Sequence, residues 1–261
     1  MNCFHKIIIL ILSLLKSISS ESSLSSSLSS SSSSSASQYK ILSETEVYSR
    51  YRKILHRKVQ FPTPSTTFSN TTINNSTTAR IVDFDIVDQR GLGAVIIFAY
   101  NTKTKTVTLL REYNPGCHEV LFGPAAGLVE SKHEDASITD NNTSENDIDD
   151  DDSEKKYWKK AAEWELEEEC HLKGGKWIEL GVETAMDKYV VTKVKPFLVL
   201  DAKTISESSD RRPLDLEEEI EIIDGITIEE IWDIICTGQM NLVGGWACML
   251  AIHKLEELGL I

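Results

Sequence analysis

Residues 161–172 read AAEWELEEECHL, and this stretch decides how the chain is interpreted. Its glutamates Glu165, Glu168 and Glu169 fall at i, i+3 and i+4, so a helix would place all three carboxylates on one face. Like charges this close destabilise a free helix, and a hard cation such as Mg²⁺ bound to their oxygens would offset that repulsion. The alternative is a solvated acidic helix, because other residues of the segment are acidic as well.

The segment before this helix adds a second signal. Residues 109–130 read LLREYNPGCHEVLFGPAAGLVE, which predicts a buried strand, a Pro-Gly turn, a short strand and a loop of small residues at 125–127. Together the two stretches resemble the Nudix hydrolases, in the branch of ADP-ribose and nucleotide-sugar pyrophosphatases. That family's box runs Gly, five residues, Glu, seven residues, then Arg-Glu-apolar-x-Glu-Glu-x-Gly-apolar. The resemblance covers roughly residues 81–261, and the positions that match the box are Gly127, Glu165, Leu166, Glu168, Glu169 and Leu172.

Three box positions depart from the family pattern. His133 stands at the place of the first Glu, although Glu134 is adjacent; Trp164 replaces Arg, and His171 replaces Gly. In the family the Arg mainly braces the glutamates. Losing the Arg and the first Glu together removes a charged pair, which disturbs a site less than losing one partner. The three helix glutamates are retained.

The resemblance implies a set of site residues. Mg²⁺, with Mn²⁺ as an alternative ion, would be held by the carboxylates of Glu165, Glu168 and Glu169 and the backbone carbonyl of Ala126. In this branch a glutamate outside the box often orients or deprotonates the attacking water. The candidates lie at 217–219, with Glu218 favoured; the alternative is that this run is only the solvent-facing end of a strand.

Substrate contacts are expected from Arg111 and Gly127. Relatives often have a phosphate- or substrate-contacting Arg at the position of Arg111, and a structural salt bridge is the alternative. The next basic position of that motif is Asn114 here, which weakens the grip on an anion. Residues 186–189 replace a Ser-Pro-Gly loop that shapes the substrate pocket in relatives.

Two functions follow as hypotheses. The first is Mg²⁺-dependent hydrolysis of the diphosphate linkage of ADP-ribose or an ADP-sugar, giving a nucleoside monophosphate and a sugar phosphate. The second is a catalytically degenerate Nudix-like module that binds a nucleotide or a protein partner.

Composition bounds the class of protein. The chain has 261 residues, 41% of them hydrophobic, and a formal net charge of −14. Ten acidic residues and no Lys or Arg lie within 134–154, so the rest of the chain carries −14 + 10 = −4. We expect an acidic disordered insertion at 134–156, because 29 residues separate Glu134 from Trp164 where the family has seven. No basic stripe with aromatic residues is present, so nucleic-acid binding is not expected.

The N-terminus has the pattern of a targeting sequence. Residues 1–20 predict a signal peptide whose apolar run, 7–15, is too short to span a membrane, and 21–40 is Ser-rich and of low complexity. Entry into the secretory pathway or secretion is expected, with a two-part plastid address as the alternative. The four cysteines after residue 3 are compatible with disulfides or with buried thiols.

The expected fold is the Nudix-type α/β/α sandwich with a mixed sheet at 80–261, preceded by an N-terminal arm and linker at 41–79. Within the arm, 43–59 is expected to be a helix or irregular, and it could contribute to a homodimer. Strands are predicted at 81–87, 93–100, 106–113, 119–122, 177–184, 195–202 and 216–223, and helices at 157–170, 227–236 and 241–258.

Overall fold

The computed structural model describes residues 39–62, 79–89, 91–130, 150–208, 211–213 and 219–261, with the side chains of 150–156 left aside. The chain divides into two compact units, Met1–Glu44 with Arg57–Phe84, and Thr45–His56 with Asp85–Ile261. The predicted targeting sequence, the Ser-rich segment and most of the predicted acidic insertion lie outside the described residues. The elements are β1 (Lys40–Ser49), β2 (Lys53–Gln60), β3 (Ile81–Asp88), β4 (Gly93–Asn101), β5 (Thr106–Asn114), β6 (Glu119–Gly123), β7 (Ala125–Val129), α3 (Asp150–Glu169), β8 (Leu172–Lys173), β9 (Lys176–Glu179), β10 (Thr184–Ala185), β11 (Lys193–Leu200), β12 (Lys203–Thr204), β13 (Ile220–Ile226), α4 (Ile228–Cys236) and α5 (Leu242–Glu257).

A mixed sheet forms the centre of the larger unit. Its strand order is β10-β11-β4-β5-β13, with β6 paired to β5, β7 to β4 and β9 to β11. Strand β11 runs parallel to β4, whereas β5, β7 and β13 pair antiparallel with their neighbours. Strand β4 is buried from Val95 to Tyr100, as its near-continuous apolar sequence predicts for a central strand.

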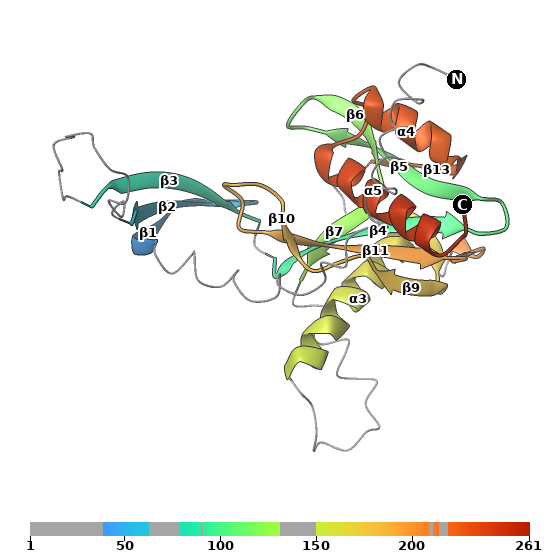
Figure 1. Ribbon diagram of the computed structural model, residues 1–261, viewed down its shortest axis with the longest axis horizontal. Helices are drawn as coiled ribbons and strands as arrows, with labels where there is room; N and C mark the ends of the chain where they lie inside the picture. The colour runs from blue at the N-terminus through green and yellow to red at the C-terminus, as the bar shows by residue number, and fades with distance from the viewer. Residues whose placement is uncertain (1–38, 63–78, 90, 131–149, 209–210, 214–218) are drawn as a thin grey trace, which may run out of the picture. The chain divides into compact units, whose positions relative to one another are not determined.

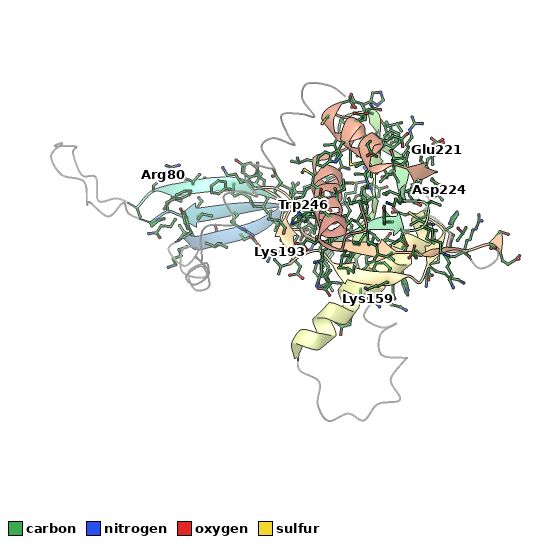
Figure 2. All side chains as sticks on the ribbon, turned by 45° about the vertical axis from the view of Figure 1, so that its right-hand side comes forward. Arg80, Lys159, Lys193, Glu221, Asp224 and Trp246 are labelled. Carbon is green, nitrogen blue, oxygen red and sulfur yellow. The ribbon has the colours of Figure 1, made fainter. Side chains whose placement is uncertain are left out.

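Helices cover both faces of this sheet (Figure 1). Because side chains alternate along a strand, Val95 and Ile97 of β4 pack in the core beneath α3, while Phe98 and Tyr100 pack in the core beneath α4 and α5. Figure 2 labels Lys159 on α3 and Trp246 on α5, in the two helical layers. The α/β/α sandwich with a mixed sheet is therefore confirmed.

The helix boundaries follow the predicted capping signals. Thr227 caps α4 as a complete capping box with Glu230, and Asn241 caps α5 by accepting a hydrogen bond from the Gly244 N–H at 2.7 Å. Helix α3 begins at Asp150, inside the segment expected to be disordered. Of the core face expected for this helix, Ala161, Ala162, Leu166 and Cys170 are buried and Tyr157 is only partly buried; Trp158, expected at the edge, is buried.

The expectation for 43–59 is wrong. These residues form most of β1 and β2, which join β3 in a three-stranded sheet. The spacing of the Val, Tyr and Ile residues fits a strand as well as a helix, and their branched or aromatic side chains favour the strand. In the smaller unit, Phe61 contacts the rings of Tyr39 and Phe84, and the Arg80 guanidinium lies 4.9 Å from its ring centroid.

The predicted loop at 125–127 is also wrong, because Ala125 begins strand β7. Three further strands differ in extent: the segment predicted at 177–184 is a strand only over Lys176–Glu179, β11 is shifted to Lys193–Leu200, and β13 starts at Ile220. Pairing with the buried strand β4 explains β7, since it satisfies backbone groups that no sequence pattern reveals.

The four described cysteines are free thiols, so no disulfide joins them. Burial raises the pKa of Cys248 to about 12 and raises the pKa of Cys170 well above its ordinary value. Both therefore stay protonated and pack as small apolar side chains. In the described part of the chain, no helix combines the length and the apolar character that crossing a membrane requires.

His171 occupies the box position where the family has glycine, and the backbone explains that preference. Its φ is +54°, in the left-handed region that a residue just after a helix often adopts and that Gly adopts without strain. We expect His171→Gly to raise the free energy of unfolding by about 1 kcal/mol, a rise of about 2–4 °C in the melting temperature.

Thermal unfolding followed by circular dichroism measures this, with His118→Gly as the control. His118 has a similar φ of +60°, but its Nδ1 lies 2.6 Å from the Tyr113 hydroxyl and its ring packs edge-on against Tyr113. Replacing it removes these contacts and should stabilise less or destabilise. A drop in melting temperature for His171→Gly would contradict the strain argument.

Candidate active site

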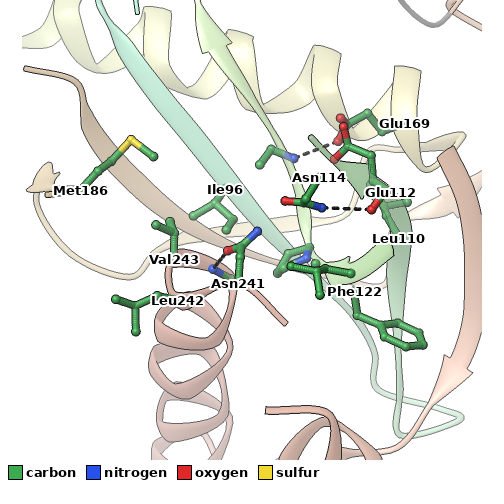
Figure 3. Close-up of a pocket in the computed structure, with 15 residues that line it drawn as sticks. Ile96, Leu110, Glu112, Asn114, Phe122, Glu169, Met186, Asn241, Leu242 and Val243 are labelled. Atoms are coloured by element: carbon green, nitrogen blue, oxygen red, sulfur yellow. Dashed lines mark hydrogen bonds between the residues drawn. The ribbon is translucent and has the colours of Figure 1, made fainter. Parts of the chain in front are cut away.

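The candidate site lies where β4 and β5 separate. The two strands pair with each other only through Ala99–Asn101 and Thr106–Thr108. Beyond that point β4 pairs with β7 and β5 pairs with β6. The turn at Gly123 and Pro124 joins β6 to β7, and the space between the separated strands is a cavity of about 320 Å³ (Figure 3).

The cavity is lined mainly by apolar groups from both layers and from the loop before β11. The N-terminal end of α5 closes one side, and Ala126 and Glu169 bring β7 and α3 to another. The lining residues are Ile96, Leu110, Glu112, Asn114, Leu121, Phe122, Gly123, Pro124, Ala126, Glu169, Met186, Asn241, Leu242, Val243 and Gly244. Two of the predicted site residues, Ala126 and Glu169, therefore lie in its wall.

Glu169 is held in place by the strand opposite. It is 4% exposed, and its Oε2 accepts a hydrogen bond of 2.8 Å from the Ala126 backbone N–H. A buried carboxylate needs such a partner, since an unsatisfied one costs several kcal/mol. This bond ties the end of α3 to the strand that carries the predicted carbonyl ligand.

Gly127 is required by the close approach of α3 to β7. A Cβ built on Gly127 would collide with the carboxyl group of Glu165, whose carbon and both oxygens occupy that space. The two residues that match the first glycine of the box and the first helix glutamate are thus in contact. Substitution by any other residue would have to displace Glu165.

The remaining helix carboxylate, Glu168, is partly exposed on the same helix. Glu165, Glu168, Glu169 and the Ala126 carbonyl offer only oxygen donors, the ligands that Mg²⁺ and Mn²⁺ prefer, and the space at Gly127 admits the Glu165 carboxylate beside β7. The donor chemistry fits a hard divalent cation. Among the described residues, however, no group of three or more His, Cys, Asp or Glu side chains is arranged to hold a metal ion.

Arg111 lies away from the cavity. Leu110, Glu112 and Asn114 line the cavity, and Arg111 alternates with them on β5. Its Nη1 donates a 3.0 Å hydrogen bond to Glu221 of β13, and its guanidinium lies 5.5 Å from the Phe122 ring centroid (Glu221 is labelled in Figure 2). This is the arrangement of the salt-bridge alternative.

Several predicted residues lie outside the described part of the chain: His133, Glu134, Glu217 and the favoured Glu218. Glu219 is described and exposed just before β13. Tyr189 and Asp187 belong to an exposed turn, whereas Met186 of the same loop lines the cavity. The divergent 186–189 segment therefore contributes to the pocket through its methionine.

A guanidinium also lies against helix α3, at the position where the sequence has Trp164 in place of the family's arginine. The Arg212 guanidinium is 4.2 Å from the Trp164 ring centroid, and its Nε donates a 3.0 Å hydrogen bond to Glu167. Stacking on an aromatic face suits the planar, weakly hydrated guanidinium. No local pattern in the sequence indicated this contact, because Arg212 comes from a loop after β12.

Glu112 is the cavity residue that the sequence analysis missed. The residue is exposed by its accessible surface, yet desolvation of its carboxyl group by the surrounding atoms raises the pKa above the ordinary value. Figure 3 shows its carboxyl group and that of Glu169 entering the same end of the cavity. Alternation along β5 places it beside Leu110 and Asn114, and that alternation was the signal available in the sequence.

Comparison with known proteins identifies the fold. No protein-family model and no curated sequence matches the chain. Among solved structures, the chain is similar to the crystal structure of an ADP compounds hydrolase, with a TM-score of 0.57 and 16% identity. The similarity covers 86% of this chain and 97% of that one. The protein therefore has the fold of the Nudix hydrolases, the mixed sheet between two helical layers that its sequence predicts.

Proposed function

We propose that this protein is a divalent-metal-dependent pyrophosphohydrolase that cleaves the diphosphate linkage of a nucleoside diphosphate sugar, with ADP-ribose or an ADP-sugar as the first candidates. The observation that carries the proposal is the junction of β7 and α3. There Glu169 accepts the Ala126 N–H, and Glu165 fills the space that Gly127 leaves beside the cavity. The similarity to a hydrolase of ADP compounds supports the same reaction class.

The chemistry assigns a role to each part of this junction. Glu165, Glu168 and Glu169, with the Ala126 carbonyl, would hold Mg²⁺ or Mn²⁺, which when bound neutralises phosphoryl charge and lowers the pKa of a coordinated water. The hydrogen bond from Ala126 fixes the Glu169 carboxylate, so little reorganisation is needed when the substrate binds. Glu218 is the candidate to orient or deprotonate the attacking water. Gly127 leaves the room that the Glu165 carboxylate needs beside β7.

A binding module without catalysis is the second candidate. The replacement of the box arginine by Trp164 and the absence of a three-residue acidic or thiol cluster among the described side chains favour it. A binding module does not explain why all three helix carboxylates are retained. Their mutual repulsion destabilises the helix, and without a bound metal nothing would offset that cost.

Metal removal separates the two candidates. With the full chain, we expect release of phosphate monoesters from at least one member of a panel of ADP-ribose, ADP-glucose, UDP-glucose, NADH and dinucleoside polyphosphates. Turnover should require Mg²⁺ or Mn²⁺ and fall to background with chelator. Nucleotide binding without turnover under any metal condition would establish the binding module instead.

A further inference from the structure

The cavity of the candidate site is acidic, although the phosphates of a nucleotide are anionic. Glu112 and Glu169 both line it, and its described lining residues include no Lys, Arg or His. Carboxylates repel phosphate oxygens unless a cation lies between them. The part of the cavity that lies away from the proposed metal ligands therefore suits an uncharged group of a substrate better than it suits the phosphates of that substrate.

Three of the four polar side chains that line the cavity are already bonded within the protein (Figure 3). Glu169 accepts the Ala126 N–H, the Asn114 Nδ2 donates to the Glu112 backbone carbonyl at 3.0 Å, and the Asn241 Oδ1 accepts the Gly244 N–H. The carboxylate of Glu112 forms no hydrogen bond or ion pair with any described residue. Among the four polar side chains of the described lining, it is the one with two oxygens that are both available to accept from a ligand.

The chemistry of this acceptor selects its ligand. An ionised carboxylate only accepts hydrogen bonds, and its two oxygens can accept from neighbouring hydroxyl groups. Ile96, Leu110 and Met186 supply apolar surface for the carbon faces of a ring. A polyhydroxylated ring such as a sugar combines both features.

We propose that Glu112 accepts hydrogen bonds from the hydroxyl groups of the second sugar, the one on the side of the diphosphate away from the nucleoside, and so makes the site selective for nucleoside diphosphates that carry such a sugar. The inference rests on the proposed function. Glu169, a proposed metal ligand, lines the same cavity as Glu112, so a sugar bound at Glu112 would lie beside the diphosphate bond that is cleaved. It identifies a specificity residue, separate from the predicted metal ligands.

The test compares two substrates that differ only in the group on the second phosphate. ADP-ribose carries a second sugar there, whereas the methyl ester of ADP carries a methyl group and keeps the diphosphate. Glu112→Leu should lower kcat/KM for ADP-ribose by about 10- to 100-fold, the range expected for a lost hydrogen bond to a charged group, and leave the ester nearly unchanged. Glu112→Gln should retain part of the ADP-ribose activity, because its amide oxygen still accepts. Glu119→Leu, which removes an exposed carboxylate of β6 outside the cavity lining, is the matched control.

Two results would overturn the inference. An equal loss on both substrates would make Glu112 a metal ligand or a base, and no loss on either would remove it from the site. If the wild-type protein turns over neither these two compounds nor any other member of the panel, the proposed function fails, and calorimetric binding in Mg²⁺ still decides the sugar contact. Glu112→Leu should then abolish the preference for ADP-ribose over the ester, and an unchanged preference would refute the contact.

Discussion

Glu168→Gln should lower turnover of the preferred substrate by about three orders of magnitude, because it removes several kcal/mol of charge stabilisation in the transition state. Glu168 is partly exposed, so the fold should persist. The melting temperature of the metal-free protein should stay the same or rise slightly, because one of three repelling charges on α3 is removed. Steady-state kinetics at saturating Mg²⁺ and circular dichroism measure both effects.

Glu163→Gln provides the matched control on the same helix. Glu163 accepts a 2.9 Å hydrogen bond from Lys159, four residues earlier, and lies off the face of the three glutamates. An exposed pair of this kind contributes about 0.3–0.5 kcal/mol, so turnover should be unchanged. Equal activity of Glu168→Gln and wild-type protein would remove the metal-site assignment.

Gly127→Ala is the second substitution with a large expected effect. The added methyl group would occupy the position of the Glu165 carboxyl, so either that side chain or strand β7 must move. A displacement of about 1 Å at a catalytic group is expected to cost about 100-fold in rate. We expect kcat to fall by that amount, with a smaller loss of stability.

Gly181→Ala is the control for this change, because nothing lies within 4 Å of its added methyl group. It should leave both rate and melting temperature close to the wild-type values. If Gly127→Ala instead unfolds the protein, the variant Gly127→Ala/Glu165→Gly separates the causes: removing the Glu165 side chain should restore stability but not turnover. Full activity in Gly127→Ala alone would contradict the contact between box glycine and helix glutamate.

The sequence predicted those parts of the fold that depend on local patterns. The sequence indicated the apolar run of β4, the Thr227–Glu230 capping box and the buried face of α3. Apolar residues recur with the period of a strand or a helix, and capping residues stand at fixed positions relative to a helix start. The strands β1, β2 and β7 were missed. Each depends on pairing with a distant segment, and a short run of small or mixed residues does not specify that pairing.

The same limit applies to the site. The motif named Gly127, Ala126 and Glu169 as candidates, but it predicted neither the contact of Gly127 with Glu165 nor the role of Ala126 as a hydrogen-bond donor to Glu169. Glu112 lies beside Glu169 only because β4 and β5 separate, and strand separation leaves no signature in the sequence of β5. The ion pair of Arg111 with Glu221 of β13 could not be predicted either, because the two residues are more than a hundred positions apart in the sequence.

The stacking of Arg212 on Trp164 bears on how this site could have diverged. An arginine at position 164 would place a second guanidinium beside that of Arg212, and the two positive charges would repel each other. The aromatic face on which Arg212 stacks would also be lost. A tryptophan at 164 without Arg212 would leave Glu167 without its hydrogen bond from that side chain. The two positions therefore depend on each other: changing either side chain alone removes a contact that the other one makes.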